Sequence, residues 1–118
     1  MTALIDLPSC SDPDTALVIA TNLLEPALRL RDNDFWHANA LSLLSGYLLA
    51  AALGDNDVDT VFAWTADPEN RRPLELLRGG PVPQWAQECE AILLPEETRN
   101  RVLFTALDAL QGTTPHPA

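Results

Sequence analysis

The stretch that decides the fold is DNDFWHANALSLLSGYLLAAALGDND, residues 32–57. As a helix, its apolar run over 35–53 would measure about 28 Å at 1.5 Å per residue, which is long enough to cross a bilayer. Aspartates stand at both ends of the run, and polar residues interrupt it at His37, Asn39, Ser42 and Ser45. We therefore interpret it as the buried central helix of a bundle and not as a membrane span.

The ends and one face of this helix carry further signals. Asp34 is a suitable N-cap, and Gly54 is expected to stop the helix after its last apolar residue. Ser42, Gly46 and Ala50 recur every four residues, so their small side chains should form a shallow groove. We expect another helix to cross closely over that groove.

The remaining chain predicts helices bounded by prolines and glycines. A first helix is capped by Asp12, has Pro13 at its first position, and ends or kinks at Pro26. The other expected helices are a short one after Asp57, one that restarts at Pro73 and ends at Gly79-Gly80, a fifth within 81–94, and a sixth from Pro95 to Gly112. No stretch shows the alternation of a strand.

We therefore predict an all-α fold, a compact bundle of about six helices around the central apolar helix 35–53. The expected organisation is an extended lead-in over 1–11, a helical domain over 12–112 and a flexible tail over 113–118.

The charged residues exclude several classes of function. The chain has 118 residues with a formal net charge of -10, and its seven basic residues are all arginine. An acidic surface repels phosphate backbones, so we expect poor binding of DNA and, where a partner binds through charge, a basic partner. The absence of lysine excludes a phosphate-binding P-loop and Schiff-base chemistry. The arginines occur in pairs and are interpreted as ordinary solvated residues.

Candidate catalytic and metal-binding residues are few. His37 and His116 lack the spacing of a zinc site, so no metal or cofactor is predicted. Cys10 and Cys89 are far apart in the sequence, and we interpret them as reduced thiols of a cytoplasmic protein. Cys89 falls on an inward stripe, whereas Cys10 lies in the lead-in, where it can be exposed.

Several segments together resemble the all-α domain of type IV secretion coupling proteins, of the actinobacterial type. They are LPSCSDPDTA, then DNDFWHANALSLLSGYLLAAALGDNDVDTVFAWTADPE, LELL and ETRNRVLFTALDAL, which span 7–110. In these conjugative ATPases the domain is inserted in a RecA-like hexameric motor on the cytoplasmic side. The resemblance implies recognition of the relaxosome or of secreted protein cargo.

The same resemblance implies that ATP hydrolysis belongs to the motor. No motor motif is found here, so we predict no catalytic residue and read the chain as an excised domain that is monomeric in isolation. A small acidic helical enzyme or metal-dependent hydrolase is an alternative, and a DNA-binding helical domain is a further one. The predicted partner-binding site is an acidic rim of helix-end residues: Asp55, Asp57, Asp59, Asp67 and Glu69.

Overall fold

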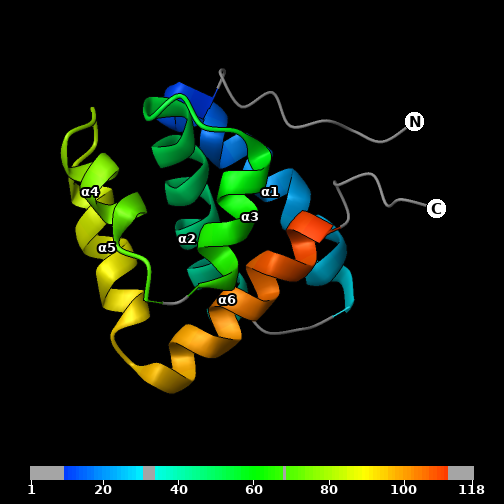
Figure 1. Ribbon diagram of the computed structural model, residues 1–118. Helices are drawn as coiled ribbons and strands as arrows, with labels where there is room; N and C mark the ends of the chain where they lie inside the picture. The colour runs from blue at the N-terminus through cyan, green and yellow to red at the C-terminus, as the bar shows by residue number, and fades with distance from the viewer. Residues whose placement is uncertain (1–9, 31–33, 68, 112–118) are drawn as a thin grey trace.

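The computed structural model of the protein describes residues 10–30, 34–67 and 69–111, with side chains described throughout except at 25–30, 34–37 and 108–111. Within these ranges the chain forms six α-helices and no strand, so the predicted all-α class is confirmed. The helices are α1 (Pro13–Leu30), α2 (Asp34–Leu53), α3 (Val58–Ala66), α4 (Arg72–Arg78), α5 (Gln84–Leu93) and α6 (Glu96–Gln111) (Figure 1).

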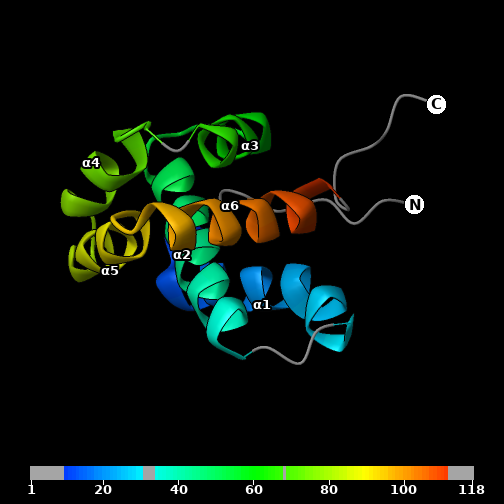
Figure 2. The ribbon, with the colours of Figure 1, turned by 90° about the horizontal axis from the view of Figure 1, so that it is seen from below.

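Helix α2 is the centre of the bundle, as the sequence predicted. It contacts each of the other five helices, and every residue from 43 to 51 is buried. A helix that is apolar on most sides gains stability only when neighbours cover all of those sides. Figure 2 shows α6 lying between α3 and α1, across the front of α2. Among the described helices, none combines the length and apolar composition needed to cross a membrane.

Buried polar groups in α2 and α3 are satisfied within their own helices. Ser45, 1 % exposed, donates its hydroxyl to the carbonyl oxygen of Leu41 at 2.7 Å. Thr65 donates in the same way to the carbonyl oxygen of Val61, also at 2.7 Å. A hydroxyl that bonds to the preceding turn can enter the core without an unpaired donor.

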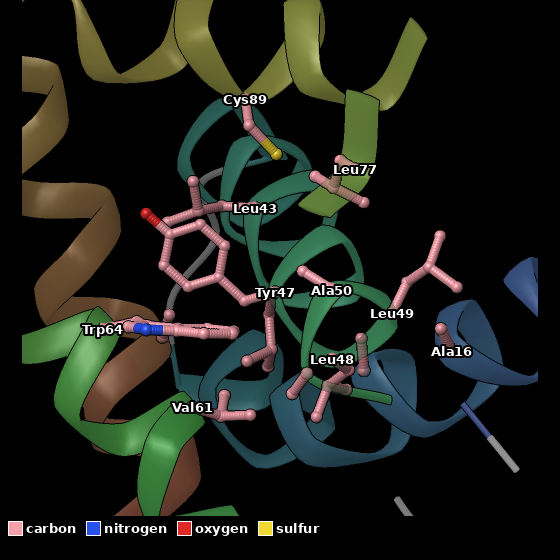
Figure 3. Close-up of a cluster of buried hydrophobic side chains, with 14 of the residues drawn as sticks. Ala16, Leu43, Tyr47, Leu48, Leu49, Ala50, Val61, Trp64, Leu77 and Cys89 are labelled. Carbon is pink, nitrogen blue, oxygen red and sulfur yellow. The ribbon is translucent and has the colours of Figure 1, made fainter. Parts of the chain in front are cut away.

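The groove on α2 is filled by two helices. A Cβ atom built at Gly46 would lie 2.8 Å from Cys89 Sγ on α5 and 3.4 Å from Leu77 Cδ1 on α4. The Cys89 thiol also reaches the carbonyl oxygen of Ser42, at 3.9 Å. Figure 3 shows the side chains of Cys89 and Leu77 turned toward α2. The predicted close crossing is therefore confirmed.

Helix α3 is anchored to α2 by an aromatic pair. The rings of Tyr47 and Trp64 meet edge to face, with centroids 6.3 Å apart and an interplanar angle of 84°. Both side chains are buried, and Val61 lies beside them (Figure 3). In this edge-to-face geometry the quadrupoles of the two rings attract each other. The contact holds the inner face of α3 against α2.

Pro26 does not end α1, contrary to one of the two predicted outcomes. The helix begins at Pro13, where the carbonyl oxygen of Asp12 accepts the backbone N–H of Ala16 at 3.0 Å, and it continues through Pro26 to Leu30. A proline inside a helix removes one backbone hydrogen bond and adds a local clash. Because α1 packs along α2, tertiary contacts offset that cost.

The end of the predicted lead-in also differs from the expectation. Cys10 and Ser11 form a turn of 3-10 helix that leads into α1, and the Cys10 side chain is fully buried in the core. The suggestion that Cys10 can be exposed was wrong, because a small apolar thiol next to α1 gains more from burial than from solvent. The rest of the lead-in, 1–9, and the predicted tail, 113–118, lie outside the described residues.

Candidate functional site at the two ends of helix α3

The corner between α2 and α3 is built on an uncommon backbone conformation at Asp55. Its φ is 55°, and among the described residues other than glycine it has the one positive φ. The backbone N–H of Asn56 donates to the carbonyl oxygen of Ala51 at 2.8 Å, and that of Asp55 donates to Ala52 at 3.2 Å. This pair of bonds is a Schellman motif, which satisfies the last carbonyls of α2 and requires a left-handed residue.

Gly54 stops α2 where the sequence predicted, but for a different physical reason. Its own φ is not positive, because the left-handed position is one residue later. A Cβ at Gly54 would lie 2.7 Å from Asn56 Nδ2 and 3.1 Å from Leu76 Cδ1. A larger residue at this position would therefore require the side chains of Asn56 and of Leu76, on α4, to move.

Asp57 caps α3, as predicted. Its carboxylate accepts a hydrogen bond from the backbone N–H of Thr60 at 3.0 Å and another from the Thr60 hydroxyl, also at 3.0 Å. Asp59 follows in the first turn, where a negative charge interacts favourably with the helix dipole. Both aspartates are exposed, so they have a structural role and are also accessible to a partner.

Asp67 and Glu69 lie at the opposite end of α3. Asp67 is the C-cap residue, and its carboxylate accepts the backbone N–H of Glu69 at 3.2 Å. Helix α3 has nine residues and is therefore about 13 Å long. The five acids thus form two exposed groups separated by this length: Asp55, Asp57 and Asp59 at the first end, and Asp67 and Glu69 at the second.

A group of arginines that the sequence interpretation treated as ordinary solvated residues gathers around α4. Arg71 Nη1 and Arg78 Nη2 approach the same atom, Glu90 Oε2 on α5, at 4.0 and 3.3 Å. Arg72 pairs with Glu75 within α4, at 3.3 Å. All five side chains are about half exposed, so these pairs contribute little to stability. The seven-residue spacing of Arg71 and Arg78, about two helical turns, was a signal that they lie on the same side, Arg71 at the N-cap of α4 and Arg78 at its last residue.

The cysteines lie in the core. The pKa of the Cys89 thiol is raised to about 12, mainly by burial and to a smaller extent by the nearby Glu88 carboxylate. A thiol with such a pKa is protonated at neutral pH and is a poor nucleophile. Burial likewise raises the pKa of the Tyr47 hydroxyl. No group of three or more His, Cys, Asp or Glu side chains within the described ranges is arranged to hold a metal ion. The His37 side chain and His116 lie outside the described part.

Comparison of the chain with protein-family models, with curated proteins and with solved structures gave no match. The resemblance to coupling-protein domains therefore stays a prediction that depends on the residues quoted for it. The site residues have to be judged from their own geometry.

Proposed function

We propose that this chain is a non-catalytic docking domain that recognises the relaxosome or secreted protein cargo for a type IV secretion coupling protein. In the full-length protein it would lie at the cytoplasmic face of the membrane, as part of a hexameric motor. The order of its segments supports this proposal, as does an all-α bundle around α2. The observation that carries it is the exposure of all five predicted carboxylates at the ends of α3, a helix anchored to the core by Trp64.

The charges favour a basic protein surface as the partner. The net charge of -10 attracts cationic partners over long range and repels a phosphate backbone. Exposed charges on a partner and on this chain would act mainly on the association rate, and they would be screened as salt rises. We therefore expect an affinity for cargo that falls with increasing ionic strength.

The five acids differ in whether their carboxylates already accept hydrogen bonds within the fold. Asp57 and Asp67 already accept hydrogen bonds from backbone N–H groups beside them. For Asp55, Asp59 and Glu69, no hydrogen bond or ion pair of the carboxylate is found within the described part of the chain. These three can pair with a basic partner without giving up a bond in the fold, so we assign them the larger share of docking.

A charge-neutralising variant tests this assignment. The triple variant Asp55→Asn, Asp59→Asn and Glu69→Gln should weaken binding of relaxase or secreted cargo from the same transfer system by about tenfold or more. A matched control is Asp14→Asn, Glu88→Gln and Glu96→Gln, which removes the same charge from other exposed positions. Titration calorimetry at several salt concentrations measures both. Equal loss in the two triples would mean that net charge alone, and not this site, guides binding.

Two further experiments test the proposal. Labelled single-stranded DNA should show no micromolar binding to the isolated chain at about 150 mM salt in an anisotropy titration. Salt-sensitive binding in that range would support a DNA-binding domain instead. Sequencing the native gene around this chain should also reveal a phosphate loop upstream and a RecA-like acidic strand downstream, and their absence would refute the family assignment.

A further inference from the structure

We draw no further inference here: the strongest candidate, the side-chain cluster of Arg71, Arg78 and Glu90 where α4 meets α5, carries nothing, because both guanidinium groups already approach the Glu90 carboxylate and nothing in the described part of the structure shows which ligand or partner would cover them.

Discussion

The close crossing of α5 over α2 can be tested at Gly46. Replacing this glycine with alanine places a Cβ 2.8 Å from Cys89 Sγ, which is about 0.6 Å shorter than an ordinary contact of 3.4 Å. Overpacking of this kind costs about 1–3 kcal/mol. Alanine gains about 1 kcal/mol over glycine in a helix interior. We therefore expect Gly46→Ala to lower the free energy of unfolding by about 1 kcal/mol, and by no more than about 2 kcal/mol.

A double-mutant cycle isolates the contact with the sulfur. Cys89→Ala alone removes the buried thiol and should cost about 1–2 kcal/mol for the lost contacts and the space left behind. In that background the new methyl group at position 46 has room, since the next neighbour, Leu77 Cδ1, lies at 3.4 Å. Gly46→Ala should therefore stabilise the Cys89→Ala chain by about 1 kcal/mol.

The coupling free energy of this cycle is the quantity to measure. It equals the overpacking cost, about 1–3 kcal/mol, because helix propensity contributes equally in both backgrounds. Urea denaturation of the four chains, followed by circular dichroism and tryptophan fluorescence, gives each free energy of unfolding. A coupling below about 0.5 kcal/mol would refute the close contact between Gly46 and Cys89. Gly46→Leu, which adds three more carbons at this site, should abolish the cooperative unfolding transition.

Three further predictions concern the corner of α3 and the buried thiol. Asp55→Gly should raise the free energy of unfolding by about 0.5–1 kcal/mol, because glycine adopts the left-handed conformation without a steric cost; a decrease in urea denaturation would show that the Asp55 carboxylate stabilises the fold. Asp57→Ala should lower the free energy of unfolding by about 1 kcal/mol through loss of the N-cap, while Asp57→Asn, which still accepts the hydrogen bond, should change it by only a few tenths in the same assay. The pKa of Cys89 is raised from 9.0 to about 12, so the unfolded chain loses this proton first and stability should fall by at most about 1.4 kcal/mol per pH unit above pH 9. Comparing urea midpoints at pH 8 and pH 10 tests this, and an equally steep loss in Cys89→Ala would assign it to other groups.

The central position of α2 has a consequence for how function is divided in this molecule. Its residues 43–51 are all buried, so no partner can touch them in the folded state. The acids assigned to docking lie on α3 and in the segments beside it, and α3 contacts α2. Helix α2 therefore acts as support, and substitutions in it should affect the docking surface through stability.

Local signals in the sequence were sufficient to predict that the helices exist and approximately where they begin and end. Pro13 begins α1, Asp57 caps α3, and Gly79-Gly80 follow the end of α4, as their intrinsic backbone preferences predict. The Ser42, Gly46 and Ala50 spacing also indicated a close crossing, because a row of small residues on a buried helix leaves room for a neighbour. It did not indicate that two helices, α4 and α5, would share that room.

The chemistry of the candidate site was only partly predictable. Asp57 was identified as a cap because its side chain acts on a backbone N–H three residues away. The division of the five acids into two groups follows from the nine-residue length of α3. The Tyr47–Trp64 contact between distant segments instead fixes how α3 lies against α2. The pairing of Arg71 and Arg78 with Glu90 likewise joins separate helices.

By itself, the amino-acid sequence determined the all-α class, the central helix and most helix ends, since each depends on residues within a few positions of one another. Tertiary structure alone decided that α1 continues through Pro26 and that Cys10 is buried. These outcomes are set by the free energy of contacts between elements far apart in the chain, and local propensity does not contain that energy.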